Sequence, residues 1–225
     1  MGSPSQVPRM IPPLARRFVA GETPAEALEH TRRLNEDDVG ALLNRLGEHY
    51  DEPGPADADA DAYVTLVDDI GDSDVRATVS IKPTQLGLGV SEGVFRENLD
   101  RVVTRADERD VFVWIDMEDH DTTDATLDAY EHHAREHGDV GVCVQANLRR
   151  SREDLQRLAG LPGKIRLVKG AYSPPADVAF QSAERVNQAF KRSLRLMFRE
   201  FDDGIALGSH DPEMVQLAAD LHDEY

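Results

Sequence analysis

Six short apolar stretches, each ending in a polar or charged side chain, constrain the fold of this 225-residue chain more than any other feature. The gap between successive stretches is long enough for one amphipathic helix. Strand, polar tip and helix in repetition is the pattern of a parallel (β/α) barrel, whose functional groups gather at the carboxyl ends of the strands. A closed TIM-type barrel has eight strands, so we expect an α/β fold with an incomplete barrel of about six. The stretches are 42–48, 78–87, 111–119, 140–146, 165–172 and 205–211, and they present Glu48, Lys82, Asp116, Gln145, Arg166 and His210.

Helices are predicted between the strands from apolar periodicity, with Ser91 and Ser151 as the amino-terminal caps of two of them. For the alternation ADADADA at 56–62, a linker is the alternative to a helix. The apolar residues of the longest periodic stretch, including Phe180, are expected in the core rather than against a cofactor. The helices are expected at 23–33, 57–70, from Ser91 onward, 123–136, 151–159, 178–201 and 212–225.

The chain carries a strong excess of negative charge. Its 43 Asp and Glu against 25 Lys and Arg give a formal net charge of −18 at pH 7. An acidic surface repels nucleic-acid phosphates and anionic lipid, which excludes nucleic acid as a partner and argues against a stable membrane anchor. Such an excess is typical of a halophilic acidic surface, where salt screens the self-repulsion.

The sequence contains no recognisable membrane span or targeting segment. No run approaches the roughly 18 uninterrupted apolar residues of a membrane helix. Arg16 and Arg17 interrupt the apolar patch near the N-terminus, unlike the apolar region of a signal peptide. We therefore expect a cytoplasmic protein. The single cysteine, Cys143, excludes an intramolecular disulfide and is expected to be a small buried side chain without a base or metal partner.

Lys82 and Asp116 follow two successive strands and are candidates for one pocket. Lys82 precedes a proline and the glycines of TQLGLG, and its ammonium group suits an anionic substrate group such as a carboxylate. Asp116 ends a run apolar enough to be buried on both faces, so it requires a partner, and Lys82 is the expected one. A purely structural ion pair is the alternative. Glu118 and Asp119 are expected to be solvated or to cap a helix.

Three further candidates lie at the ends of the next two strands. Gln145 ends a strand without other polar groups, and its amide can donate to and accept from the edge of a heteroaromatic ring. Arg166 offers a permanent cation that would stabilise negative charge on a cofactor or substrate. Lys169 precedes Gly170–Ala171, whose bare backbone N–H groups suit a phosphate. An ordinary surface pair is the alternative for the two basic residues.

The histidines are ambiguous. His210 follows the last strand, where a structural hydrogen bond is the alternative to a functional role, and Ser209 beside it is suited to a phosphate or ring edge. Four more lie together at His120, His132, His133 and His137. His133 and His137 have the spacing of zinc ligands on one helical face, but the pattern places no third ligand and we expect exposed, charged surroundings. We therefore expect no metal ligand, and a zinc-dependent barrel hydrolase is the alternative.

Five ordered motifs resemble those of the flavin-dependent proline dehydrogenases, and the resemblance covers about residues 10–225. It implies a distorted (β/α)₈ barrel that holds FAD at its carboxyl-end mouth. It also implies oxidation of L-proline at C5 to Δ1-pyrroline-5-carboxylate, the first step of proline catabolism. The motifs are SIKPTQLGLG (80–89), WIDMEDHDTTDATL (114–127), VCVQANL (142–148), RLVKGAY (166–172) and GSHD (208–211), with RFVAGET (17–23) and RLGEHY (45–50) upstream.

The resemblance implies a role for each matching residue. Lys82 would pair with the proline carboxylate, Asp116 would be its active-site partner, and Arg166 would lie against the flavin ring near its reactive nitrogen. The family's use of membrane quinone implies a quinone as electron acceptor and peripheral contact with the membrane. The residues that would hold FAD are Met117 through its backbone, Gln145, Val168, Lys169, Gly170, Ala171, Ser209 and His210.

Three departures from the family pattern bear on function. Pro174 stands where an acidic residue often follows KGAY-x, and Asn147 stands where an aromatic residue is usual. Counterparts of the last two strands, the final helix and a Tyr-x-x-Arg-Arg clamp for the carboxylate are absent, so we expect a chain truncated at its C-terminus. A degenerate, non-catalytic flavin-binding barrel fragment is the alternative function. We expect residues 1–9 to be unstructured and 10–225 to form one barrel domain, and we predict no oligomeric state.

Overall fold

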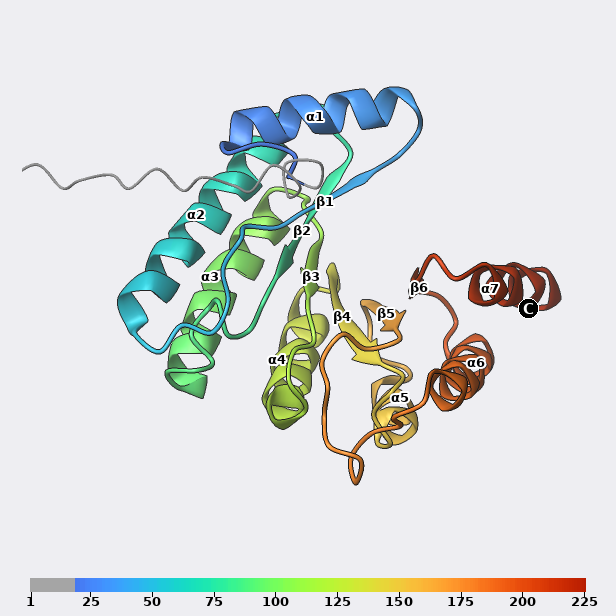
Figure 1. Ribbon diagram of the computed structural model, residues 1–225. Helices are drawn as coiled ribbons and strands as arrows, with labels where there is room; N and C mark the ends of the chain where they lie inside the picture. The colour runs from blue at the N-terminus through green and yellow to red at the C-terminus, as the bar shows by residue number, and fades with distance from the viewer. Residues whose placement is uncertain (1–18) are drawn as a thin grey trace, which may run out of the picture.

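The computed structural model describes residues 19–225, which form one six-stranded parallel sheet and its covering helices (Figure 1). The strands lie in the sheet in chain order. Among the described residues β1 and β6 each pair with a single strand, so the sheet is an open arc and the predicted incomplete α/β barrel is confirmed. The unstructured segment expected at 1–9 lies outside the described residues. The strands are β1 (Ala41–Leu43), β2 (Ala77–Ile81), β3 (Val113–Ile115), β4 (Val140–Gln145), β5 (Lys164–Val168) and β6 (Ile205–Gly208).

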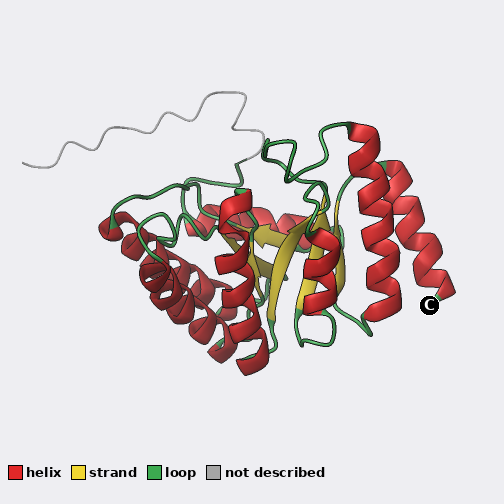
Figure 2. Cartoon of the chain, turned by 90° about the horizontal axis from the view of Figure 1, so that it is seen from below, coloured by secondary structure: helices red, strands yellow, loops and turns green. Residues whose placement is uncertain are grey.

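Helices alternate with the strands and lie on the outer side of the arc (Figure 2). This is the repeated β-α-β unit, in which each helix carries the chain back so that the next strand runs parallel to the last. A helix also precedes β1, and a 3₁₀ turn precedes the fourth helix. The helices are α1 (Pro24–Glu36), α2 (Pro53–Gly71), α3 (Glu92–Glu108), η2 (His120–Thr122), α4 (Thr123–Glu136), α5 (Ser151–Leu158), α6 (Ala183–Glu200) and α7 (Pro212–Glu224).

Two predicted helix starts are confirmed by their capping bonds. The Thr23 hydroxyl accepts a hydrogen bond from the Glu26 backbone N–H at 3.3 Å, and the Glu26 carboxylate accepts one from the Thr23 N–H at 3.3 Å. Ser91 Oγ accepts from the Val94 N–H at 3.2 Å at the start of α3. These bonds satisfy N–H groups that have no partner within the helix, which is why the helices begin there.

Two local predictions are wrong. Ser151 does not cap α5, because Arg150 occupies the N-cap position and the Ser151 hydroxyl donates to the Gln145 carbonyl at the end of β4. Phe180 is not part of the helix predicted at 178–201, because α6 begins at Ala183. The residues before α6 instead form an isolated bridge between Leu148 and Ala179, which holds the loop against the end of β4.

The alternation ADADADA forms the first half of α2, so the linker alternative is wrong. Ala56 and Ala60 are fully buried, and Asp59 is buried with them. The Asp59 carboxylate accepts hydrogen bonds from Arg45 at 2.9 Å and from Gln85 at 2.6 Å. Because both partners come from outside the helix, tertiary contacts, rather than the local sequence, hold this segment in place.

The core lies between the sheet and its outer helices. Successive side chains of a strand point to opposite faces, so every second strand residue enters this core. These core residues are fully or almost fully buried: Val79, Ile81, Val113, Ile115, Val142, Ile165 and Leu167. The intervening positions, Ser80, Trp114, Cys143 and Arg166, are thereby left for the inner side of the arc.

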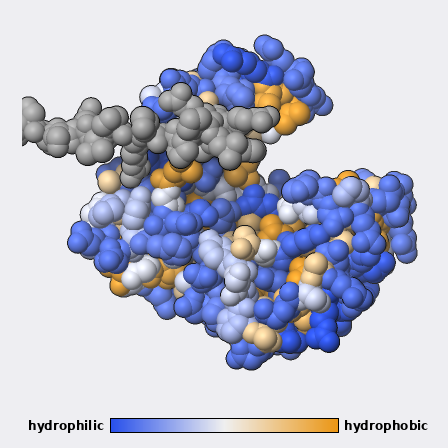
Figure 3. Space-filling view, viewed as in Figure 1, coloured by the Kyte–Doolittle hydropathy of each residue, from blue (hydrophilic) through white to orange (hydrophobic). Residues whose placement is uncertain are grey.

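The surface seen in Figure 3 is mostly hydrophilic, with small apolar patches between the polar regions. This agrees with the excess of acidic residues in the chain. Within residues 19–225, no helix has both the length and the apolar character that crossing a membrane requires.

Candidate active site at the carboxyl ends of the strands

An ion pair between Arg166 of β5 and Asp116 at the end of β3 is the centre of the candidate site. Arg166 Nη2 lies 2.5 Å from Asp116 Oδ1, and the Ser80 hydroxyl of β2 donates to the same oxygen at 2.8 Å. The two charged side chains are about a fifth exposed, at 17% and 23%. Three strands therefore bring their polar groups together, as the barrel pattern predicts.

The Arg166 guanidinium is also held from its other sides. Its Nε lies 2.9 Å from Cys143 Sγ on the neighbouring strand, and its Cζ lies 4.9 Å from the Trp114 ring centroid, within cation–π range. Cys143 and Arg166 are register partners in the β4–β5 ladder, which places the thiol beside the arginine. The orientation of Arg166 is thus determined before any ligand binds.

Cys143 lies inside this cluster and is not an isolated apolar residue. It is 4% exposed, and its Sγ is 3.6 Å from Asp116 Oδ1 as well as 2.9 Å from Arg166. Burial, together with the charge of Asp116, raises its pKa to about 12, so it remains a neutral thiol at physiological pH. The expectation of a buried side chain is confirmed, and the structure adds two polar neighbours, Arg166 and Asp116, that the sequence did not indicate.

Lys82 does not pair with Asp116 as expected; its closest carboxylate is Glu48, with Nζ 3.5 Å from Oε2. Burial pulls the pKa of Lys82 down, but Tyr172, Asp116 and other nearby acidic groups outweigh it and leave the pKa above its usual value. Lys82 therefore remains a cation within electrostatic reach of Asp116. The pairing differs from the prediction because Arg166, from two strands away, reaches the aspartate directly.

Glu118 is fully buried, so the expectation that it is solvated is wrong. Its two oxygens accept hydrogen bonds from the backbone N–H and the hydroxyl of Thr84, each at 2.7 Å. Burial raises the pKa of Glu118, and the bonds from Thr84 oppose that rise. The Gln145 amide donates to the Glu118 carbonyl at 2.8 Å, which ties β4 to the same loop. Glu118 thus links the loops that follow β2 and β3 with the end of β4.

A second charged pair lies at the ends of β5 and β6. Lys169 Nζ is 2.5 Å from Asp211 Oδ2, and Ser209 Oγ accepts from the Asp211 N–H at 3.2 Å. His210, between these two residues, is exposed. The pair brings together two predicted cofactor residues, Lys169 and Ser209, by way of Asp211, which is also the N-cap residue of α7.

Gly170, next to Lys169, has a backbone conformation that requires glycine. Its φ is +114°, and a Cβ atom there would lie 2.3 Å from Asn147 Oδ1. Asn147 Oδ1 is itself buried without a hydrogen-bond partner in the described part of the chain. The Asn147 side chain therefore packs directly against the Gly170 backbone, with its oxygen left unsatisfied. The remaining predicted cofactor residues are Met117 and Gln145, which are buried, Val168, which is half-buried, and Ala171, which is exposed.

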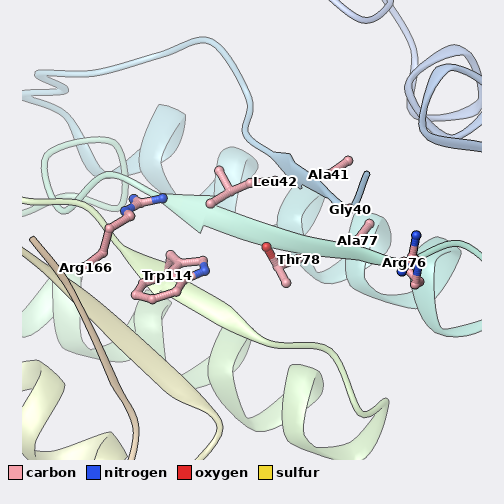
Figure 4. Close-up of a pocket in the computed structure, with 8 residues that line it drawn as sticks. All are labelled: Gly40, Ala41, Leu42, Arg76, Ala77, Thr78, Trp114 and Arg166. Carbon is pink, nitrogen blue, oxygen red and sulfur yellow. The ribbon is translucent and has the colours of Figure 1, made fainter. Parts of the chain in front are cut away.

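A pocket of about 460 Å³ extends along the inner side of the arc from this cluster (Figure 4). Arg166 and Trp114 line it together with residues of β1 and β2. Its volume falls within the roughly 300–1,000 Å³ that is usual for small-molecule sites. Three residues that contact Arg166 or Asp116 were missed by sequence reasoning, namely Ser80, Trp114 and Cys143. Each lies two residues before a predicted site residue on the same strand face, and that period of two could have identified them.

An open parallel barrel with a cluster of charged side chains at the carboxyl ends of its strands belongs to the (β/α)-barrel class, whose known active sites lie at this end. The model of one family within that class, proline dehydrogenase, matches residues 27–225. The chain belongs to the proline dehydrogenase family.

Curated relatives agree with this assignment. Proline dehydrogenase 1 of Bacillus subtilis (strain 168) is 31% identical over 211 residues, which cover 94% of this chain and 70% of that protein. Proline dehydrogenase of Deinococcus radiodurans is 34% identical over 209 residues, which cover 90% of this chain and 66% of that protein. The chain thus spans about two thirds of the length of these relatives.

Solved structures resemble the fold. Proline utilization A from Bdellovibrio bacteriovorus, inactivated by N-propargylglycine, superposes with a TM-score of 0.82 at 22% identity and covers 94% of this chain and 27% of its own. Proline utilization A from Corynebacterium freiburgense gives a TM-score of 0.77 at 22% identity, with coverage of 94% and 26%. At these identities the likeness shows that the barrel arc is shared.

Proposed function

We propose that this chain oxidises L-proline to Δ1-pyrroline-5-carboxylate, with FAD as the hydride acceptor. The observation that carries the proposal is the Arg166–Asp116 pair, held by Ser80 and Cys143 and within electrostatic reach of Lys82, in a chain of the proline dehydrogenase family. Cationic groups beside a pocket of small-molecule size suit an amino-acid substrate with a carboxylate.

The residues at the ends of β4 and β5 fit a flavin nucleotide. Gly170 lets the Asn147 side chain lie directly against the backbone, and Asn147 Oδ1, which has no partner in the described residues, is available as an acceptor. Lys169 brings a cation to the same loop for a phosphate. When bound, FAD supplies a two-electron acceptor. The other residues we assign to its binding are Met117, Gln145, Val168, Ala171, Ser209 and His210.

Lys82 is the proposed partner of the substrate carboxylate. Its side chain is one quarter exposed, and its raised pKa keeps it charged at neutral pH. Glu48, its present partner at 3.5 Å, is half exposed and held loosely, so a substrate carboxylate can replace it at low cost.

Arg166 is proposed to stabilise the negative charge that develops as the substrate is oxidised. A preorganised cation is effective in that role because it need not reorient during the reaction. Asp116, Ser80 and Cys143 provide the preorganisation through the contacts described above. In this proposal Asp116 forms an ion pair with Arg166, and its effect on Lys82 is the electrostatic attraction between their charges.

The proposals for the physiological electron acceptor and for membrane contact rest on the family alone. We infer a quinone as the acceptor and a cytoplasmic protein in peripheral contact with the membrane.

The visible absorption spectrum of the purified chain, before and after anaerobic addition of L-proline, tests the proposal. We expect flavin bands that L-proline bleaches and D-proline leaves unchanged, together with proline-dependent dye reduction. Flavin bands that L-proline does not bleach would favour the non-catalytic flavin-binding alternative. A chain that takes up no flavin when FAD is added would contradict both.

A further inference from the structure

Away from the candidate active site, the last turn of α4 brings three potential metal ligands together: His132, His133 and Glu136. One ligand atom from each lies within 4.8 Å of the other two. His132 Nε2 and Glu136 Oε2 are 3.4 Å apart, close to the roughly 3.3 Å between two ligands of a tetrahedral ion with bonds of about 2.0–2.1 Å. Because α4 leads into β4, this turn lies at the amino-terminal end of the strands, opposite the candidate active site (Figure 1).

His133 provides an independent sign of a ligand. Its side chain is 2% exposed, and its Nδ1 is buried without a hydrogen-bond partner in the described part of the chain. Buried polar atoms nearly always have a partner, and a metal ion would satisfy a ring nitrogen here.

The geometry selects a different histidine pair from the one that the sequence suggested. His133 and His137 have the zinc-like spacing, but His137 Nδ1 lies 3.2 Å from Asp107 Oδ2 of α3 and is engaged there. His132 and Glu136 are each about half exposed, at 55% and 53%, which leaves a route for an ion and room for water ligands. The expectation of exposed surroundings is therefore wrong for His133, which is buried, and for His137, whose side chain is only 16% exposed.

We propose that His132, His133 and Glu136 form a binding site for a divalent transition-metal ion such as Zn²⁺, completed by water. Two imidazoles and one carboxylate favour Zn²⁺, Co²⁺ or Ni²⁺ over Mg²⁺ and Ca²⁺, which require mostly oxygen ligands. The role is structural, because the ion would hold the last turn of α4 at the opposite end of the strands from the Arg166–Asp116 pair. The site is independent of the function proposed above.

The untagged full chain, stripped of metal with a chelator, tests this site. Titration with Co²⁺ should give the visible ligand-field absorption of a low-coordinate complex at one equivalent per chain, and Zn²⁺ should abolish it. At a Zn²⁺ concentration of about 100 times Kd, Tm should rise by roughly 5–10 °C, whereas Mg²⁺ should leave it unchanged. No Co²⁺ absorption together with no Zn²⁺-dependent rise in Tm would overturn the proposal.

Variants identify the ligands. His132→Ala and Glu136→Gln change exposed side chains, so the chain should fold as before, and each should lose most of the Zn²⁺-dependent rise in Tm. The matched controls are His222→Ala and Glu153→Gln, which change exposed residues of the same types on α7 and α5 and should keep the full rise. If the controls lose the rise as completely as His132→Ala and Glu136→Gln, binding is non-specific and the proposal is wrong.

Discussion

The central strand β4 and the edge strand β6 hold equivalent places in the repeat but differ in burial. All six residues of β4 are buried, whereas the residues of β6 are half-buried or exposed. Both strands are apolar, but β4 lies between two strands while β6 pairs only with β5 among the described residues. The comparison teaches that the neighbours of a strand in the sheet, more than its own composition, decide how deeply it is buried.

The acidic residues that follow the strands show the same contrast. Glu118 follows the central strand β3 and is fully buried with both oxygens bonded to Thr84. Glu48 follows the edge strand β1 and is half exposed, with Lys82 at 3.5 Å. The centre of the sheet therefore carries rigid polar contacts, and its edge carries loose ones that a ligand can replace.

Asp116→Asn should have the largest effect. It removes the negative charge that orients Arg166 in the centre of the sheet but keeps the shape of the side chain. We expect a loss of about 10²–10³-fold in kcat for proline-dependent dye reduction, with flavin content little changed. Asp119→Asn, a short distance along the same loop, is the control and should retain activity. Equal losses in the two variants would show that the Arg166 pair has no special role.

Core truncation tests the contrast between central and edge strands directly. Leu167→Ala on β5 removes a fully buried side chain, and we expect a loss of about 3 kcal/mol in the free energy of unfolding. Leu207→Ala on β6 removes the same atoms from a half-buried site and should cost about 1–2 kcal/mol. Urea denaturation measures both. Equal costs would mean that β6 has partners in solution that the described residues do not provide.

Gly170→Ala tests whether the end of β5 is shaped for a cofactor. The positive φ and the contact with Asn147 should cost about 1–3 kcal/mol of stability and reduce flavin content. Gly138→Ala is the matched control, because Gly138 also has a positive φ, of +81°, but has open space around its Cα. It should cost about 1 kcal/mol and leave flavin content unchanged. A similar flavin loss in both variants would contradict a cradle at Gly170.

The smallest expected effect is on the pH dependence of stability. Because burial raises the folded-state pKa of Glu118, the folded protein binds this proton more tightly than the unfolded chain does. The stability that Glu118 contributes through this proton is therefore present at low pH. It is lost as the pH rises from the ordinary glutamate pKa through the raised one. Glu118→Gln should flatten that part of the curve, measured by urea unfolding between about pH 4 and 7. An unchanged slope in Glu118→Gln would show that the raised pKa of Glu118 is not the cause. Glu48→Gln removes the same charge at the edge of the sheet and is the control.

The sequence was most informative where the signal is local. Each strand overlaps its apolar stretch, although β1 (Ala41–Leu43) shares only residues 42 and 43 with the stretch 42–48. Thr23 and Ser91 cap the helices predicted to begin there. The sequence was least informative where a side chain has several possible hydrogen-bond partners. Ser151 has the residue type of an N-cap, but the carbonyl at the end of β4 lies within its reach and takes its hydrogen bond. The sequence around Ser151 does not show where the Gln145 carbonyl will lie, because that position depends on how the chain folds.

What the sequence by itself determined is the repeat of strand, polar tip and helix, and with it the set of residues that reach the carboxyl ends of the strands. The periodicity of apolar residues along a strand or helix is a local property, so it can be recognised in the sequence. Only the tertiary structure decided that Arg166 pairs with Asp116 and that Lys82 pairs with Glu48. It also decided that Glu118 and His133 are buried. Those outcomes depend on distances across the sheet and between helices, which exist only once the strands are in register.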